Sequence, residues 1–548
     1  MVNGDLILFI AELVFCTVLF ILAHFAEKYV SSKWRICYLI PAIFCLVFTA
    51  LGTLEICMLG VYIGSALNLA GFFCEKKKIR QLSSAIAAAS ILTALPASLL
   101  YSGYRAPAYI EDFKIAFAKM KDHYILAEHK GVDWDELYDE YLPKFSSAEA
   151  NNDEIENFIY WLEFASEFRD GHVGYMPNGD YEKISEKAFD RIFGNDYGLS
   201  LMSLSDGRIA AVNVDPSLNS LGIANGTIVT AWDGKDPVEI GKEYTKYSPI
   251  AFADKDNEYF YRALYAAGVG GDTVTVTYLD DSGNEKTAEL KKMGVYYSDR
   301  MKKTLEIVDG GLDVGHFEWV ELDDKTIAIR MKMMMYDRDS SKSNDYSVVK
   351  NVFVTNLREY IAQGYENLII DMRGNSGGAG EMVKAIAEVI APEGEHYYCT
   401  DGLWDQEAKQ YAYNEETGKF YESTKNYYTG TGFWKGKVII IVNSSSISAA
   451  DHTVEILSDF DNITIMGFTE SNGSAQGIGG VYLQNGMFQF SSSLLLDENG
   501  NVSVDSGADF ESGNDIEIRV PFDDNAVEAL FDNDRDYLID KALEEFSK

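Results

Sequence analysis

The chain has 548 residues, enough for about three or four domains, and its formal net charge is −38. Residues 1–105 carry 8 basic and 5 acidic groups, which leaves 39 basic against 80 acidic groups in the rest of the chain. Because so acidic a surface repels phosphate backbones, we expect no nucleic-acid partner.

The first 105 residues are mostly apolar and predict transmembrane helices. Leu6–Phe25 and Leu82–Tyr101 are each long enough to cross a hydrocarbon core of about 30 Å, and 36–73 fits two crossings joined by a turn. Basic residues cluster before and after 36–73, and both clusters are expected to be cytoplasmic. An even number of crossings must then separate them, so we expect four helices in all. We therefore expect a multi-pass protein of the cell membrane, held in the lipid bilayer by 1–105, with its remaining domains outside the cytoplasm.

Cysteine is almost confined to the apolar region. Five of the six cysteines lie in 1–105, and only Cys399 lies beyond it. The exported part therefore cannot form an internal disulfide and must be held by its hydrophobic core. Cys/His spacings typical of zinc sites are absent as well. We expect neither a metal ion nor an organic cofactor.

Two regions of different periodicity follow the apolar segment. Apolar residues at helical spacing across 110–169 predict a small helical domain over 106–190. Short alternating runs such as Arg208–Val214 and Asp272–Tyr278 predict a β-rich domain over 191–300.

Strands and helices then alternate from residue 301 to the end. Buried β-branched runs at 326–331, 367–372 and 437–442 alternate with helical patterns at 348–361 and 381–390. This alternation predicts an α/β domain with a largely parallel or mixed sheet over 301–548. A segment rich in Tyr, Glu and Gly, 404–431, predicts a surface insertion.

The most informative stretch runs from Val438 to Leu457, where a buried strand enters a small-residue turn and Ser448 opens a helix. A hydroxyl at this place lies where helix N-terminal amides can stabilise developing negative charge. From the residues alone, an N-capping serine is the plainer explanation. Four serines in five residues, 444–448, also leave the choice of serine open.

A second buried strand meets a glycine-rich turn at Asp371-Met-Arg-Gly-Asn-Ser-Gly-Gly378. Glycine lets a backbone amide approach a reacting carbonyl without an intervening side chain. The turn lacks the Gly-Lys-Ser/Thr of a P-loop and the spacing of a dinucleotide fingerprint, so it predicts neither nucleotide site.

Together the two stretches resemble a known family of serine peptidases, which includes C-terminal processing (tail-specific) and tricorn-type enzymes. Asp371–Gly378 is similar to the family signature Asp-x-Arg-x-Asn-x-Gly-Gly, and Ser448-Ala-Ala-Asp is similar to its nucleophile motif Ser-Ala-Ser-Glu. Asp170-Gly-His172 resembles its Asp-x-His element. The resemblance covers roughly 110–546.

This resemblance, added to the apolar region, predicts the fold class. We expect a multi-domain protein with an all-α transmembrane region (1–105), a small helical domain (106–190), a PDZ-like β-rich domain (191–300) and an α/β catalytic domain of the ClpP/crotonase-like type (301–548).

The resemblance also implies roles for single residues. Ser448 is the expected nucleophile, with the backbone amides of Ala449 and of Gly377 or Gly378 forming the oxyanion hole. The C-terminal processing branch uses a lysine downstream of the serine, but no lysine occurs between Ser448 and Lys541. We therefore expect the tricorn-type arrangement, in which a histidine from the upstream domain activates the serine.

His172 stands at the matching place, and an imidazole with an ordinary pKa near 6.5 suits a general base. His452 is an alternative, but one helical turn after Ser448 it points toward helix packing. Tricorn-type enzymes orient the histidine with a C-terminal carboxylate, for which we expect Asp505. Asp170 is expected to form a turn, and Asp451 to begin a helix.

We therefore expect a serine endopeptidase that acts on exported or membrane proteins. A PDZ-like domain that binds free C-termini by strand addition would direct cleavage toward those ends. The alternative is a catalytically inactive peptide- or ligand-binding protein on the same scaffold.

Overall fold

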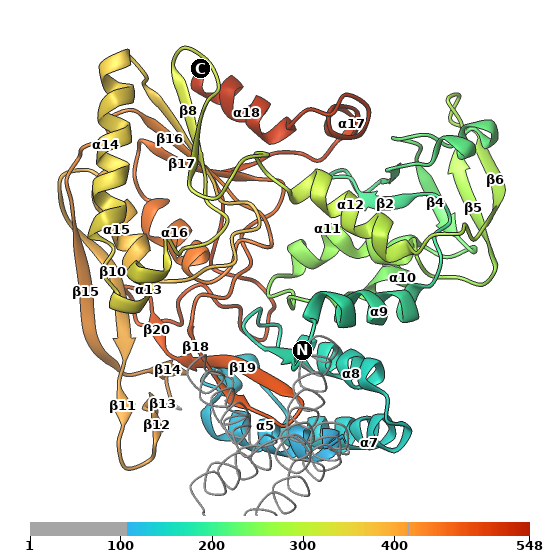
Figure 1. The fold of residues 1–548 in the computed structure, drawn as a ribbon, viewed down its shortest axis with the longest axis horizontal. Helices are drawn as coiled ribbons and strands as arrows, with labels where there is room; N and C mark the ends of the chain where they lie inside the picture. The colour runs from blue at the N-terminus through green and yellow to red at the C-terminus, as the bar shows by residue number, and fades with distance from the viewer. Residues whose placement is uncertain (1–106, 415) are drawn as a thin grey trace, which may run out of the picture. The chain divides into compact units, whose positions relative to one another are not determined.

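The largest sheet has six strands in the order β21-β17-β16-β9-β8-β7 (Figure 1). This computed structural model describes residues 107–414 and 416–548. Strands β21 to β8 run parallel, and β7 is antiparallel to β8. The strands are β7 (Glu318–Glu321), β8 (Thr326–Arg330), β9 (Asn367–Asp371), β16 (Lys437–Ile441), β17 (Ile463–Gly467) and β21 (Ile518–Arg519). The predicted β-branched runs are thus confirmed as central strands.

Side chains of these strands alternate between two faces, and each face belongs to a different core. One face packs against α14 (Ser347–Gln363), α15 (Gly380–Ile390) and α16 (Ala449–Leu457). The other face packs with α18 (Tyr537–Phe546) and joins the core of the helical and β-rich parts. Because both faces are buried, the strands are continuous apolar runs, and the helices predicted between them are confirmed.

A second sheet, β15-β10-β20, contacts α15. Its strands are β10 (Gly394–Gly402), β15 (Glu422–Gly430) and β20 (Leu495–Leu496), all antiparallel. The predicted insertion at 404–431 lies largely at the surface, but it includes the nine-residue strand β15, which belongs to this sheet and buries Tyr428 and Gly430. The preceding part forms two small antiparallel ladders (Figure 1). Their strands are β11 (Trp404–Asp405) with β12 (Gln410–Tyr411), and β13 (Tyr413–Asn414) with β14 (Lys419–Phe420).

Near the start of the described chain, three helices pack around aromatic rings. The helices are α5 (Tyr109–His123), α7 (Trp134–Asn151) and α8 (Glu154–Ser166). The rings at their centre are Phe113, Phe145, Trp161 and Phe164. The predicted helical character of this region is confirmed.

A three-stranded sheet joins this helical part to segments from far along the chain. Its strands are β1 (Gly174–Pro177), β19 (Gly486–Ser493) and β18 (Gly477–Tyr482), in the order β1-β19-β18. The loop between α8 and β1 carries His172, so the pairing of β1 with β19 fixes where this histidine lies.

The region predicted to be β-rich contains a two-stranded and a three-stranded sheet with helices beside them. Its strands are β2 (Ser200–Ser203), β3 (Ile209–Val212), β4 (Val229–Trp232), β5 (Thr273–Leu279) and β6 (Glu285–Lys291). Its helices are α10 (Pro237–Lys242) and α11 (Lys255–Ala266), and α12 (Tyr297–Asp309) leads from it to the main sheet. The strands predicted at 208–214 and 272–278 are confirmed.

Within 107–414 and 416–548, no helix combines the length and the apolar character needed to cross a membrane. This finding contradicts the all-α transmembrane region of the predicted fold class, and with it the predicted multi-pass localisation in the cell membrane and the lipid bilayer as a partner. The apolar runs of the described chain instead form buried strands. The four predicted spans, in 1–105, lie outside the described residues. The described residues form a mixed α/β, multi-domain fold.

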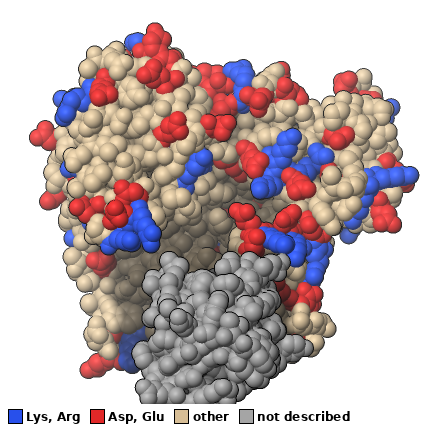
Figure 2. Space-filling model, viewed as in Figure 1, with Lys and Arg blue, Asp and Glu red and all other residues tan. Residues whose placement is uncertain are grey.

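Charged side chains are spread over the surface of the described residues. Figure 2 shows acidic and basic side chains interspersed on the visible face, rather than gathered in one patch of either sign. On this face the acidic groups are therefore distributed, as expected for a solubilising exterior.

Candidate active site

Ser448 lies between the end of β16 and the start of α16. It has a left-handed φ of 66°, which is unusual for a residue other than glycine and occurs often at functional sites. Of the serines at 444–448, which are all described, Ser448 alone lines a cavity of about 710 Å³ beside the turn. The hydroxyl of Ser446 instead donates a hydrogen bond of 2.8 Å to the Met372 carbonyl. The structure thus distinguishes between serines that the sequence left equivalent.

Asp451 ties the first turn of α16 to a neighbouring loop. Its buried carboxylate accepts backbone hydrogen bonds from Ser448 (2.8 Å), Gly473 (2.9 Å) and Ser474 (3.2 Å). Burial raises the pKa of Asp451 to about 6, although these amides oppose the shift. The predicted helix-start carboxylate therefore also holds the backbone beside Ser448.

The glycine-rich turn packs directly against Ser448. A Cβ atom added to Gly377, whose φ is 76°, would lie 2.5 Å from Ser448 Cβ and 3.1 Å from Ser448 Oγ. The amide of Gly377 donates to the Asn375 side chain (2.9 Å), and its carbonyl accepts from the Met334 amide (2.7 Å). Only glycine fits at 377 without moving the serine.

Gly378 and Ala449 line the same cavity as Ser448. Ala449 is the first residue of α16, so its amide belongs to the helix start, where backbone N–H groups have no partner within the helix. The structure therefore brings together the four predicted residues of the nucleophile and oxyanion hole, Ser448, Ala449, Gly377 and Gly378.

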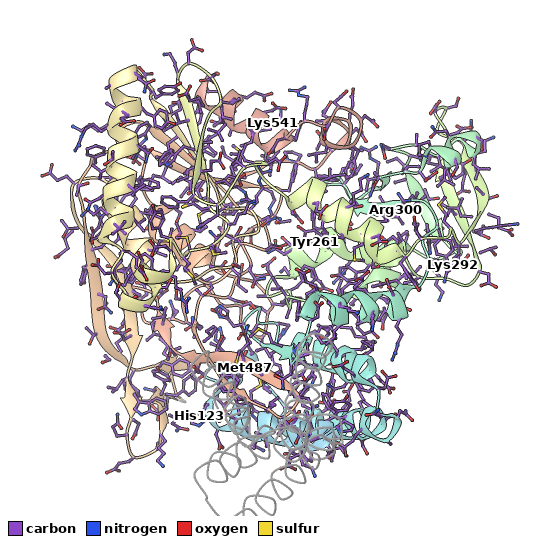
Figure 3. All side chains as sticks on the ribbon, viewed as in Figure 1. His123, Tyr261, Lys292, Arg300, Met487 and Lys541 are labelled. Carbon is purple, nitrogen blue, oxygen red and sulfur yellow. The ribbon has the colours of Figure 1, made fainter. Side chains whose placement is uncertain are left out.

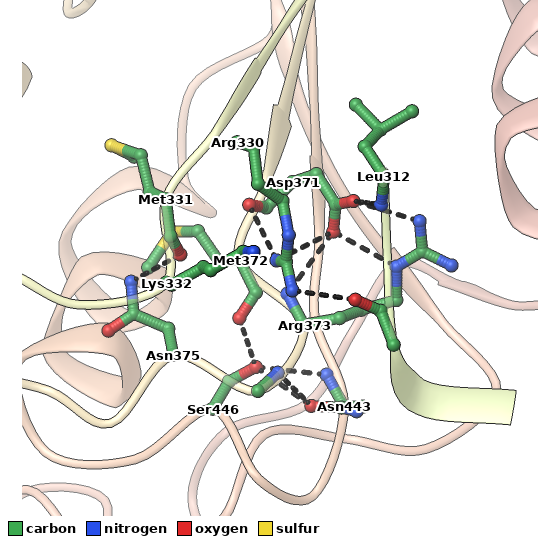
Figure 4. Close-up of polar contacts among 12 residues, drawn as sticks. Leu312, Arg330, Met331, Lys332, Asp371, Met372, Arg373, Asn375, Asn443 and Ser446 are labelled. Carbon is green, nitrogen blue, oxygen red and sulfur yellow. Dashed lines mark hydrogen bonds and ion pairs between the residues drawn. The ribbon is translucent and has the colours of Figure 1, made fainter. Parts of the chain in front are cut away.

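A buried ion-pair network holds the glycine-rich turn to the main sheet (Figure 4). The guanidinium of Arg373 donates two hydrogen bonds of 2.9 Å to Asp371 and bonds of 3.0 and 2.7 Å to Asp536. Burial alone would raise the pKa of Asp371, but Arg373, with help from Arg330, holds that pKa below its ordinary value. The Asp-x-Arg part of the signature is thus structural, and Asp536 is a partner that the sequence did not reveal.

His172 lines the same cavity as Ser448 and is almost completely buried. Its loop packs against the serine turn, because Gly171 donates 2.8 Å to Ser474 Oγ and contacts Ile447. Burial lowers the pKa of His172 below 6.5, and the nearby Asp170 carboxylate partly opposes the shift. Its Nε2 atom is buried and has no hydrogen-bond partner among the described residues.

His452, the alternative base, lines the same cavity, but one of its ring nitrogens already has a partner. Its Nε2 lies 2.8 Å from the Tyr398 carbonyl, and its ring packs against the ring of Tyr398 at 4.5 Å between centroids. Burial lowers the pKa of His452 to about 4. These contacts favour a packing role, as the helical spacing predicted.

Asp505 lies near the cavity but contacts a different group from the one predicted. Its Oδ2 accepts hydrogen bonds from the Ala475 amide (2.9 Å) and the Gln476 side chain (3.2 Å), and both of these residues line the cavity. Burial, together with the charge of Asp170, raises the pKa of Asp505 well above its ordinary value. The carboxylate thus supports the cavity wall, and no hydrogen bond joins it to His172 in the described structure.

Three lysines bear on how the serine could be activated. Lys541 lies on α18, far from β19 and its Met487 (Figure 3). Lys384 lines the cavity, with its Nζ 3.4 Å from Glu381 and 4.3 Å from the centroid of the Tyr398 ring. Lys130 is buried, and its ammonium donates to carbonyls of the loops before His172 and after Asp505. The amines of Lys384 and Lys130 are therefore paired away from Ser448.

The cavity has a volume of about 710 Å³ and is formed by several parts of the chain. Its lining includes Ser448 and His172 as well as residues of β10 and α15, among them Tyr398 and Lys384. Among the described residues, no group of three or more His, Cys, Asp or Glu side chains is arranged to hold a metal ion. The lining thus offers a serine hydroxyl, the imidazole of His172 and the backbone of Gly378 and Ala449, together with other polar side chains such as Lys384.

Comparisons with known proteins agree with this set. Residues 328–508 match peptidase family S41, and residues 107–157 match the C1 domain of tricorn protease. No curated protein matches the chain. Among solved structures, mature CPAF has a TM-score of 0.50 at 15% identity over 79% of this chain and 96% of that chain. A CPAF mutant has a TM-score of 0.50 at 13% identity, with coverages of 80% and 98%.

At these identities the two structures show a shared fold, whereas the family match covers both Asp371–Gly378 and Ser448. The hydroxyl, the glycine-rich turn and the cavity lie together inside or beside the matched region. The chain is therefore a serine-type peptidase, and its residues 328–508 are the part that matches peptidase family S41.

Proposed function

We propose that this peptidase is an endopeptidase with Ser448 as its nucleophile and His172 as its general base. Ser448 Oγ bonds to the substrate carbonyl carbon while His172 Nε2 takes the hydroxyl proton. The C–N bond then breaks, and the same nitrogen gives the proton to the leaving amine. A water molecule repeats these steps on the acyl-enzyme, which releases the second product and restores the serine.

The observation that carries this proposal is the shared cavity. Ser448, His172, Gly378 and Ala449 line one space of about 710 Å³, although they come from separate segments of the chain. That volume lies in the range of ligand-binding clefts. A buried ring nitrogen without a hydrogen-bond partner costs free energy, so the unpaired Nε2 of His172 is best explained by a partner that arrives with the reaction.

We propose that the oxyanion is held by the amides of Gly378 and Ala449. The Gly377 amide already donates to Asn375, whereas Gly378 and Ala449 line the cavity, so Gly378 is favoured over Gly377. The start of α16 adds its positive dipole end at the same place. Donors fixed in this way stabilise charge that develops in the transition state without reorganising.

The substrates we propose are polypeptides bound near their C-terminal ends, with residues 191–300 acting as a PDZ-like module. In support, β4, β5 and β6 form a small antiparallel sheet with β6 at its edge, and an edge strand can take up an extended peptide. Paired peptides with a free or an amidated C-terminus test this part. Equal cleavage of both would contradict a preference for free ends.

The test of the endopeptidase proposal is proteolysis of a denatured protein, such as casein, by the purified chain. Wild type is expected to produce internal cleavages that mass spectrometry can map, whereas Ser448→Ala should produce none. Ser445→Ala is the matched control, because Ser445 belongs to the same turn but does not line the cavity, and it should keep its activity. Equal cleavage by Ser448→Ala would contradict the assignment of the nucleophile.

A folded wild-type chain that cleaves nothing would favour a peptide-binding protein on this scaffold. Lys384→Met addresses the remaining rival base, because Lys384 is the lysine that lines the cavity. We expect this variant to lose at most a few-fold in rate. A loss as large as that of His172→Gln would transfer the role of base to Lys384.

A further inference from the structure

The second ring nitrogen of His172 faces a buried side chain from another part of the chain. Strand β1 pairs with β19 in a register that sets Gly174 opposite Gln489. Continuing this antiparallel register by two residues sets His172 opposite Ser491. The fold therefore places a hydroxyl beside the imidazole, on the side away from Nε2.

The contacts form a chain of three groups. Ser491 Oγ lies 3.5 Å from His172 Nδ1 and donates a hydrogen bond of 2.8 Å to Asp170 Oδ2. Asp170 Oδ1 accepts the backbone amide of His172 at 2.9 Å, so the same carboxylate also forms the predicted turn. Tyr124 adds a hydrogen bond of 3.1 Å to Asp170 Oδ2. All four side chains are buried.

The direction of these hydrogen bonds selects one form of the imidazole. A serine hydroxyl has one proton, and Ser491 uses it for Asp170, so its oxygen faces His172 as an acceptor. An acceptor beside Nδ1 favours the tautomer with the proton on Nδ1. Nε2 is then unprotonated, as a general base requires, on a residue that lines the cavity.

Asp505 does not fill this place. Its Oδ2 is bonded to Ala475 and Gln476 in the cavity wall, and its Oδ1 is buried with no hydrogen-bond partner among the described residues. The negative charges of Asp170 and Asp505 both favour the charged form of the Lys130 amine. Asp170 is the carboxylate that reaches the histidine through hydrogen bonds.

We infer that Ser491 and Asp170 are the positioning residues of this peptidase, and that they hold His172 in the orientation and tautomer that activate Ser448. This inference rests on the proposed function. The hydroxyl of Ser491 links the ring to the carboxylate, and Asp170 stabilises the imidazolium that forms when Nε2 takes the serine proton. Neither residue touches the substrate.

The rate at which a fluorophosphonate probe modifies Ser448, followed as a function of pH, tests the inference without knowledge of the substrate. Ser491→Ala should lower the maximal rate roughly 10- to 100-fold and Asp170→Asn at least as much, with little change in probe affinity. Both changes remove stabilisation of the imidazolium, so the acid limb of the rate profile should move to lower pH. A merely structural role would leave the position of that limb unchanged.

Three further variants serve as controls. Ser491→Thr retains the hydroxyl and should recover part of the rate, whereas Ser492→Ala, on the opposite face of β19, should behave as wild type. Asp505→Asn is expected to weaken probe binding through the cavity wall without moving the acid limb. Circular dichroism checks that each variant folds. If Asp170→Asn does not fold, the result for Ser491→Ala decides the test.

The inference is overturned if folded Ser491→Ala and Asp170→Asn keep both the wild-type rate and the wild-type acid limb. It is also overturned if Asp505→Asn alone shifts that limb. Failure of the proposed function looks different, because then wild type itself is not modified at Ser448, or His172→Gln reacts as fast as wild type.

Discussion

The two sides of the candidate active site are held in different ways. Around Ser448, Asp451 accepts three backbone amides and Gly377 packs against the serine, all within the α/β part of the chain. Around His172, the Nε2 atom has no hydrogen-bond partner within the described part of the chain, and the Nδ1 side depends on Ser491, which is distant in sequence.

The contrast predicts different effects of substitutions on stability and on activity at the two sides. The serine side is part of the buried network that holds the main sheet, so its changes should reduce stability and activity together. The histidine side is carried by a loop and a three-stranded sheet, so its changes should reduce activity and leave most of the stability in place.

The largest effect is expected from His172→Gln. Loss of a general base should lower the rate of Ser448 modification or peptide hydrolysis by about 10²- to 10⁴-fold. Thermal unfolding should change little, because the imidazole Nε2 makes no hydrogen bond to residues 107–414 or 416–548 that the variant could lose. Rates and unfolding midpoints of the same preparation check both statements. Unfolding at a much lower temperature would remove the contrast between the two sides.

Arg373→Met tests the serine side through its support. The variant leaves the buried carboxylate of Asp371 without its main partner, so we expect a loss of about 3–5 kcal/mol in the free energy of unfolding. Denaturant titration measures it. Arg208→Met is the control, since Arg208 forms only exposed ion pairs and should cost at most about 1 kcal/mol. Similar losses in the two variants would contradict a structural role for the signature arginine.

Gly377→Ala is expected to have a smaller effect on stability, with activity lost as well. Alanine at a positive φ costs about 1–2 kcal/mol, and the added Cβ must displace Ser448. Gly374→Ala is matched to it, because Gly374 has a φ of 65° but an added Cβ would meet nothing within 4 Å. The control should lose only the stability that alanine costs at a positive φ, and it should keep its rate. Equal activities would show that Gly377 does not position the serine.

The smallest effect concerns pH. Burial holds the pKa of His172 below 6.5. At pH 6.5 and above, most of the imidazole is therefore neutral and able to accept a proton. The rate of Ser448 modification should therefore rise with pH and reach half its maximum below pH 6.5. A midpoint clearly above 6.5 would mean that another group sets the limb.

The sequence could predict the serine side because its parts are contiguous. A buried strand, a small-residue turn and a helix start are local features, and the runs around Ser448 and Asp371–Gly378 carry them in full. The sequence left open which serine faces the cavity and which glycine amide is available. Both depend on hydrogen bonds, that of Ser446 to Met372 and that of Gly377 to Asn375.

The histidine side could be predicted only in part. His172 was identified by its motif, but Ser491 lies in an ordinary alternating strand, and only the register of β1 with β19 brings it to the imidazole. Asp170 was expected to form a turn and does so through Oδ1. Its second oxygen, Oδ2, accepts the hydrogen bond from Ser491. Asp505 was predicted for that role, yet its carboxylate bonds to the cavity wall.

The most direct test of the central claim is to map the adduct formed by a fluorophosphonate probe on folded protein. We predict one modified peptide, with the probe on Ser448, that disappears in Ser448→Ala and forms far more slowly in His172→Gln. Folded wild-type protein that carries no adduct, or carries it on another serine, would contradict the account.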